Sequence, residues 1–167
     1  MTETKLPVGL THLDEQGRAK MVAVAAKPET LREAVAAAVV HMSTEAFDAV
    51  VSATGRKGDA LQVSRVAGIM AAKRTADLIP LCHPVRLTSV EIEANTDAEA
   101  CTVELVATAI ALDRTGVEME AMTASAVAAL TLYDMIKGLD RTANIQSVRL
   151  LKKTGGKSGV YERPATL

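Results

Sequence analysis

The chain has 167 residues, a formal charge of −1, a hydrophobic fraction of 49% and an aromatic fraction of only 2%. This length suits one domain with a buried core, and the near-neutral charge argues against a protein that coats nucleic acid. The absence of tryptophan excludes the aromatic platforms on which single-stranded nucleic acid stacks. Because 29 residues are alanine, we expect a core of small side chains and subunit contacts that add to the buried area.

The first half of the chain predicts one strand followed by helices. Alternation over residues 19–25 favours a short strand, and the Ala-rich stretch 31–42 is interpreted as a helix. Two more helices are predicted over 43–51 and from 59 to about 75, because each begins with a Ser or Asp that can cap a helix. Residues 79–84 contain two prolines, which hold the residues before them extended and exclude a helix.

The second half predicts a hairpin, a long helix and a last strand. Residues 86–94 and 101–112 are strand candidates joined by a turn at 95–97, and a helix is predicted over 120–139. A strand over 145–152 then leads into a glycine-rich loop. The order of elements favours an α+β fold of the ferredoxin-like, split βαβ type, with an antiparallel sheet and an extra helix in the first crossover.

The sequence also predicts the limits of the domain and the cellular compartment of the protein. We predict a flexible N-terminal tail over 1–17, a single catalytic domain over 18–160 and a C-terminal tail over 161–167. Cys82 and Cys101 are too few for a disulfide framework. Without a signal-peptide pattern or a run of about eighteen apolar residues, the chain is expected to be cytoplasmic, with free thiols and with no membrane or nucleic-acid partner.

The predicted long helix has no charged side chain between Ala121 and Tyr133. A helix that is apolar all round is buried on several sides. One side can cover the sheet, and the other then needs another element or another subunit.

Charges are segregated along the chain. Residues 56–86 carry six basic side chains against two acidic ones, and residues 137–163 carry seven against two. Residues 87–134 carry nine acidic side chains against Arg114 alone. These segments are either solvated faces or basic loops that hold an anion. Glycines beside Lys57 and Lys157 favour the second interpretation, because they let backbone N–H groups and an ammonium approach one phosphate.

Two pairs near the ends of the predicted long helix can carry acid–base chemistry. Asp134 and Lys137 are three residues apart and form either a weak ion pair at a helix end or a proton-transfer pair in which partial burial shifts the pKa values. Glu118 and Glu120 share one face if that stretch is extended. Alternatively, they only stabilise the start of the following helix.

The remaining motifs give open alternatives. Adjacent side chains of an extended segment point to opposite faces, so Cys82 and His83 are not expected to pair, and Cys82 is interpreted as a small buried hydrophobe. His83 can reach a ligand, but a single histidine without a spaced partner does not make a metal site. The loop 155–158 fails the phosphate-loop pattern because Leu151 stands where a glycine is required, which leaves an anion nest or a flexible loop.

Together these motifs resemble those of one family. They are residues 57–59, 67–75, 77–84, 115–121, 132–135 and 148–159. In this order they resemble the cyclic pyranopterin monophosphate synthases, the molybdenum cofactor biosynthesis protein C family, over about residues 11–160. The length and number of the motifs make the resemblance specific.

The resemblance implies a lyase that converts 3′,8-cyclo-7,8-dihydroguanosine 5′-triphosphate to cyclic pyranopterin monophosphate with release of diphosphate. It implies that a radical S-adenosylmethionine enzyme supplies the substrate. It also implies a homohexamer, built as a trimer of dimers with sites between subunits. No cofactor is expected, although a divalent ion such as Mg²⁺ can accompany the triphosphate.

The resemblance also implies roles for single residues. Asp134 is expected to be the catalytic acid or base, and Lys57 and Lys137 the essential lysines. Expected substrate contacts are Leu81, Cys82, His83, Glu118, Met119 and Glu120, and further phosphate-binding candidates are Arg32, Lys73, Arg74, Lys153 and Lys157. A non-enzymatic nucleotide-binding module would keep the basic loops without needing the Asp134–Lys137 pair, and a purely structural assembly protein would need neither basic loop.

Overall fold

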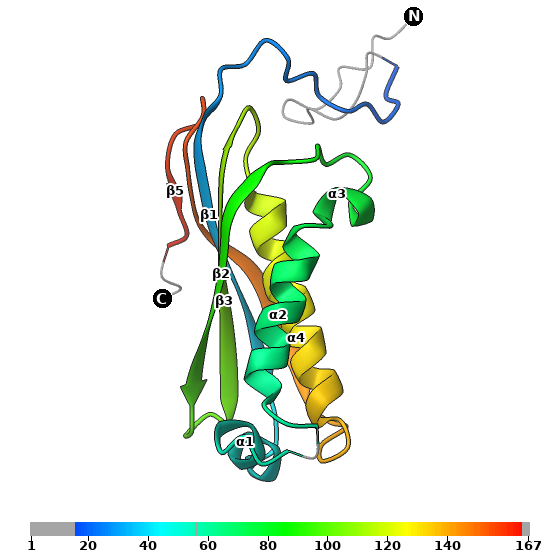
Figure 1. The fold of residues 1–167 in the computed structure, drawn as a ribbon, viewed down its shortest axis with the longest axis vertical. Coiled ribbons are helices and arrows are strands. Elements are labelled where there is room, and N and C mark those ends of the chain that lie inside the picture. Colours follow the sequence, from blue (N-terminus) through cyan, green and yellow to red (C-terminus); the bar gives the residue numbers. More distant parts are fainter. Residues whose placement is uncertain (1–15, 56, 165–167) are drawn as a thin grey trace, which may run out of the picture.

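Five antiparallel strands form one sheet in the order β2-β3-β1-β4-β5. The structure is a computed structural model, and it describes residues 16–55 and 57–164 (Figure 1). The strands are β1 (Thr30–His41), β2 (Leu87–Asp97), β3 (Thr102–Asp113), β4 (Asn144–Thr154) and β5 (Tyr161–Glu162). The helices are α1 (Thr44–Val51), α2 (Ala60–Ala72), α3 (Thr75–Leu78) and α4 (Glu118–Ile136).

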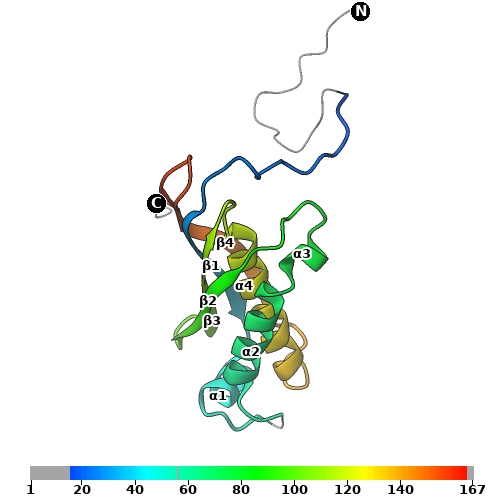
Figure 2. The same ribbon diagram turned by 45° about the horizontal axis from the view of Figure 1, so that its top comes forward.

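The predicted α+β, ferredoxin-like fold is confirmed. Helices α1 to α3 connect β1 to β2, a hairpin joins β2 to β3, and α4 returns the chain to β4 beside β1. Helices α2 and α4 lie on the same side of the sheet in both ribbon views (Figures 1 and 2). The short strand β5 lies within the segment predicted as a C-terminal tail, whereas residues 1–15 of the predicted N-terminal tail lie outside the described residues.

The prediction of a helix over 31–42 is wrong, because this segment is the central strand β1. It pairs with β3 on one side and with β4 on the other. From Ala34 to Val40 the strand has only alanine and valine on both faces, so the sequence lacks the polar alternation that identifies a strand. The pairing overrides the helix preference of alanine.

The strand predicted over 19–25 is also wrong, since apart from an isolated bridge at Ala19 this segment has no strand pairing.

The other elements agree with the sequence within a few residues. Ser43 accepts a hydrogen bond from the N–H of Ala46 and caps α1, and Asp59 accepts one from Gln62 and caps α2. Strand β2 continues through the predicted turn to Asp97, so the hairpin turns at 98–101 instead.

The core lies between the sheet and the helix pair, and small side chains bring these layers close together. The alanines of α4 that face inward are fully buried. Gly68 marks the closest approach of α2, because a β-carbon there would overlap Ile92 of the sheet and the carbonyl oxygen of Ala124 in α4. The many alanines therefore allow the helices to pack closely against each other and against the sheet.

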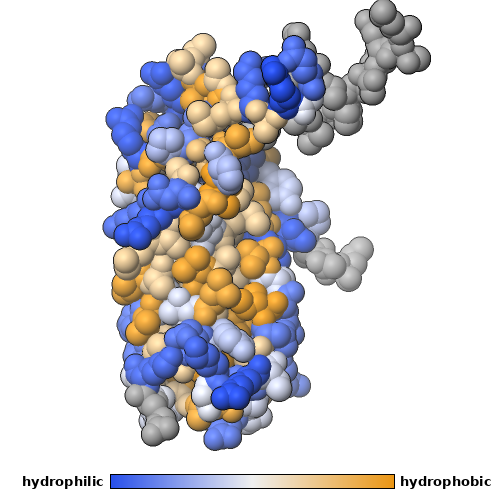
Figure 3. Space-filling view, turned by 90° about the vertical axis from the view of Figure 1, so that its right-hand side faces the viewer, coloured by the Kyte–Doolittle hydropathy of each residue, from blue (hydrophilic) through white to orange (hydrophobic). Residues whose placement is uncertain are grey.

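The helix pair also presents an exposed apolar face. Val63, Val66 and Met70 of α2 and Leu130 of α4 are between 42% and 57% exposed. Hydrophobic side chains gather on the side of the molecule where these helices lie (Figure 3). We call these four residues the helical apolar face. Within the described residues, no helix is both long and apolar enough to cross a membrane.

Candidate functional site

Asp134 is held between two lysines at the end of α4. Its Oδ2 is 2.8 Å from Nζ of Lys57, and its Oδ1 is 2.6 Å from Nζ of Lys137. Lys57 also donates to the main-chain oxygen of Asp134 at 2.9 Å. We call these three residues the aspartate–lysine cluster. The structure thus brings together the three side chains for which the resemblance implies catalysis.

Local backbone structure positions this cluster. Asp134 lies in the last turn of α4, and the N–H of Lys137 donates to the carbonyl oxygen of Tyr133 as the helix ends. Lys57 comes from the loop before α2, where a turn closes with a hydrogen bond from Gly58 to Gly55 at 2.9 Å. Gly58 has a φ of 85°, which glycine adopts without steric cost.

The cluster is solvent-accessible, in contrast to the partial burial expected from the apolar sequence before it. The Asp134 side chain is 52% exposed. Hydrogen bonds and charge from Lys137 and Lys57 lower the pKa of Asp134 to about 2, and Asp134 in turn raises the pKa of Lys137. A cavity of about 580 Å³ adjoins the cluster, with Lys57, Tyr133, Lys137 and Arg141 among its lining residues.

A second group of predicted residues lines a cavity of about 290 Å³ beside the start of α4. Its lining includes all six residues expected to contact the substrate, namely Leu81, Cys82, His83, Glu118, Met119 and Glu120. Cys82 and His83 therefore line one cavity, although an extended backbone predicted opposite directions. We call this the thiol–histidine cavity.

Glu120 is the titratable group with the strongest burial in the thiol–histidine cavity. The residue is 4% exposed. Burial, followed by the charges of Glu118 and Asp113, raises the pKa of Glu120 to about 7, against an opposing hydrogen bond from its own backbone. Burial and the charge of Glu120 also raise the pKa of the Cys82 thiol. At neutral pH Glu120 can therefore both give and accept a proton.

A third cavity, of about 530 Å³, has a basic lining. Its cationic residues are Lys27, Arg32, Arg114, Lys153 and Lys157. We call it the basic cavity. It adjoins the thiol–histidine cavity, because Lys27, Gly116 and Glu118 line both.

The glycine-rich loop after β4 encloses Arg32 in the basic cavity. Gly155 and Gly156 have φ values of 90° and 72°. A β-carbon at Gly156 would overlap the guanidinium of Arg32, and one at Gly155 would overlap the carbonyl oxygen of Leu31. Only glycine combines this backbone shape with the missing side chain, so the loop can pack on Arg32. Lys153 donates a hydrogen bond to Ser158 within the same loop.

Comparison with known proteins assigns the family. Residues 21–156 match the MoaC family. The chain belongs to this family. It is 56% identical over 150 residues to the cyclic pyranopterin monophosphate synthase of Roseiflexus castenholzii, covering 90% of this chain and 95% of that protein. The synthase of the same name from Trichlorobacter lovleyi is 56% identical over 156 residues, covering 93% and 98%.

In this MoaC-family chain, the predicted site residues form two groups at opposite ends of α4. Glu118 begins the helix and Asp134 lies in its last turn. At about 1.5 Å per residue they are roughly 24 Å apart along the helix axis. The basic loops at Lys57 and Lys157 thus lie at different ends and do not meet within one chain.

Other residues fall outside these groups or were missed. Lys73 and Arg74 lie exposed where α2 gives way to α3 and are not among the residues that line the three cavities. Sequence reasoning missed Lys27 and Arg114 of the basic cavity. The available signal for Arg114 was its position as the single base of an acidic segment, directly before Thr115 and Gly116. Among the described residues, no three His, Cys, Asp or Glu side chains gather as a metal site would require.

Proposed function

We propose that this protein is a cyclic pyranopterin monophosphate synthase of molybdenum cofactor biosynthesis. It converts 3′,8-cyclo-7,8-dihydroguanosine 5′-triphosphate to cyclic pyranopterin monophosphate and diphosphate. The observation that carries the proposal is the adjoining pair of cavities in a chain more than half identical to proteins of that name. One cavity is basic enough for a triphosphate, and the other offers a thiol, an imidazole and carboxyl groups to a purine-derived ring.

The two cavities divide the substrate between them. Phosphate oxygens prefer the guanidinium and ammonium groups of the basic cavity, where Arg32, Lys153 and Lys157 contact them. The ring enters the thiol–histidine cavity, where Glu118 and Glu120 accept hydrogen bonds from its N–H groups. The two cavities adjoin and share lining residues, so one molecule can occupy both at once.

The aspartate–lysine cluster supplies acid–base groups for the rearrangement. With a pKa of about 2, Asp134 is a carboxylate at neutral pH and forms ion pairs with both lysines. The lysine ammonium groups give protons and neutralise developing negative charge. Closure of the cyclic phosphate requires a hydroxyl to lose its proton and its oxygen to bond to the α-phosphorus, while diphosphate leaves with the bridging oxygen.

The working site combines two copies of the chain. Glu118, which lines the basic cavity, lies roughly 24 Å from Asp134 along α4, so we do not expect one nucleoside triphosphate to reach both groups in one chain. The aspartate–lysine cluster of one subunit therefore completes the cavities of a neighbour. The helical apolar face supplies surface for subunit contacts, in a homohexamer built as a trimer of dimers.

Three further features follow from the resemblance. The substrate comes from a radical S-adenosylmethionine enzyme, and the protein works in the cytoplasm. It requires no resident cofactor, and a divalent ion such as Mg²⁺ can enter with the triphosphate. Addition of EDTA to the assay below measures whether turnover depends on that ion.

One assay tests the proposed function. Purified protein is incubated with the cyclic dihydroguanosine triphosphate, while diphosphate release and pterin fluorescence are followed. Both signals are expected to rise in proportion to enzyme. If folded protein binds the compound but produces neither signal, the alternative of a non-enzymatic nucleotide-binding module is correct.

A further inference from the structure

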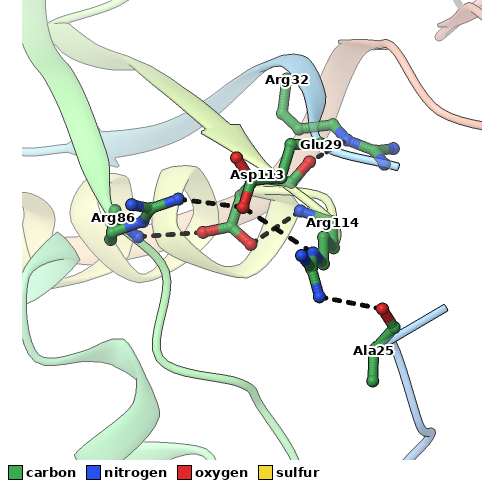
Figure 4. Close-up of polar contacts among 6 residues, drawn as sticks. All are labelled: Ala25, Glu29, Arg32, Arg86, Asp113 and Arg114. Atoms are coloured by element: carbon green, nitrogen blue, oxygen red, sulfur yellow. Dashed lines mark hydrogen bonds and ion pairs between the residues drawn. The ribbon is translucent and has the colours of Figure 1, made fainter. Parts of the chain in front are cut away.

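Three arginines, Arg32, Arg86 and Arg114, meet at the end of β3, and of these only Arg32 was assigned to the site from the sequence. Asp113 accepts hydrogen bonds from the backbone N–H of Arg86 at 3.2 Å and of Arg114 at 2.7 Å. Its main-chain oxygen accepts one from Nε of Arg32 at 3.2 Å. Figure 4 shows these residues gathered around Asp113 and Glu29. Asp113 thus fixes the backbone from which two arginine side chains extend.

Glu29 then holds the heads of two of these arginines. Its Oε1 is 3.2 Å from Nη2 of Arg86 and 3.7 Å from Nε of Arg114. Arg114 also donates through Nη1 to the carbonyl oxygen of Ala25 at 2.8 Å. The two carboxylates of Glu29 and Asp113 lie among three guanidinium groups, so the arrangement keeps an excess positive charge.

Of these residues, Arg32 and Arg114 line the basic cavity, whereas Arg86 and Glu29 do not. Nε of Arg114 is buried and makes no hydrogen bond within the described part of the chain. A buried donor without an acceptor is costly unless a ligand or a small shift supplies one. Arg114 therefore has donor capacity that this chain alone leaves unused.

We propose that Arg114 binds the phosphate chain of the substrate in the basic cavity, and that Glu29 is a positioning residue that holds the Arg114 guanidinium at the cavity. This proposal rests on the proposed function for the identity of the substrate, but not for the presence of an anion site. A guanidinium fixed by a carboxylate loses less side-chain freedom when it binds phosphate. Ala25 and Glu29 both precede β1, so the same contacts hold this segment against the cavity.

The test is calorimetric binding of inorganic tripolyphosphate to the full-length protein at fixed ionic strength. We expect Arg114→Gln to weaken binding about tenfold, because a charge-assisted hydrogen bond pair is lost. Arg86→Gln is the matched control, since Arg86 contacts the same carboxylate but lies outside the cavity. It is expected to change the affinity by less than about twofold. Equal affinities of Arg114→Gln and wild type, or equal losses in the two variants, would overturn the role of Arg114.

The positioning role has its own readout. Glu29→Gln is expected to raise KM about threefold at constant kcat, and Glu29→Asp to restore part of this change. In the Glu29→Gln/Arg114→Gln double variant, tripolyphosphate affinity is expected to equal that of Arg114→Gln alone, because Glu29 acts through Arg114. Additive losses, or a fall in kcat with unchanged KM, would contradict this role. Binding differences that persist in a protein without synthase activity would reject the proposed function and leave the anion site standing.

Discussion

At the scale of single residues, we expect the aspartate–lysine cluster to matter for the proposed reaction but to contribute little to the stability of the fold. The three side chains are about half exposed, and solvent-exposed ion pairs contribute little to folding. Their geometry is nevertheless specific, with each carboxylate oxygen of Asp134 assigned to a different lysine. Substitutions here therefore report on chemistry more than on folding.

Lys57→Ala and Lys137→Ala are expected to lower kcat by about 100-fold or more, the usual effect of losing a positioned acid or base. Thermal unfolding is expected to shift by no more than about 2 °C, because the lost ion pairs are exposed. Diphosphate release and differential scanning fluorimetry measure the two effects. Lys152→Ala is the control, since Lys152 pairs with Glu33 at similar exposure but lines none of the three cavities. Near-normal turnover in either cluster variant would contradict the assignment.

Glu120 predicts a pH dependence of stability. Its pKa is raised to about 7 in the folded protein, above that of the unfolded chain, so the folded state holds the proton more tightly between these values. Stability is therefore highest below the unfolded pKa and falls as pH rises towards 7. In wild type relative to Glu120→Gln, this loss is expected to reach roughly 3 kcal/mol by pH 8.

Urea unfolding of both proteins at pH 5, 6, 7 and 8 measures this difference. Glu91→Gln serves as the control, because Glu91 is exposed and is not among the groups that shift the pKa of Glu120. Parallel stability curves for wild type and Glu120→Gln would show that burial of Glu120 imposes no charge penalty.

At the scale of elements, local signals in the sequence predicted the helix boundaries well. They failed for a strand whose structure depends on pairing with distant strands. The caps Ser43 and Asp59 act within their own segments, so they could be identified from the sequence. Strand β1 could not, because its partners β3 and β4 lie more than 60 residues away and hydrogen-bond to both of its edges. The same limit explains why Arg114 was missed, since its role depends on segments from three parts of the chain.

The contact between α2 and α4 depends on one glycine. Gly68→Ala is expected to destabilise the protein by about 2 kcal/mol, because the added methyl group would overlap Ile92 and the backbone of α4. Chemical denaturation measures the change. Gly138→Ala is the control, because a β-carbon there meets no atom within 4 Å. Equal stability of Gly68→Ala and Gly138→Ala would mean that the helices separate without cost.

At the scale of the whole molecule, the important fact is that the two groups of site residues face different ends. The motifs of the sequence point to candidate site residues, because each motif is short and local. It could not predict that Lys57 and Lys157 lie apart, because separation along a helix appears only in the folded chain. The separation therefore supports the sites between subunits that the resemblance implies.

Mixing of variants tests the shared site. Asp134→Asn and Lys153→Ala damage different halves, so co-expression of the two chains places some intact halves next to each other. We expect each variant alone to be nearly inactive, and mixed oligomers to recover about a quarter of wild-type turnover if subunits assemble at random. Co-expression of Asp134→Asn with Lys57→Ala, which damage the same half, is the control. No recovery in the first mixture would mean that sites do not cross subunits.

The position of α4 between two half-sites has a consequence for mixed populations of the protein. In the proposed assembly each helix serves one active site with its first turn and another with its last turn. A subunit damaged at both ends therefore disables two sites, and the active fraction falls as the square of the intact fraction. A damaged copy of this gene that still assembles would then be more harmful to a cell than a deleted one.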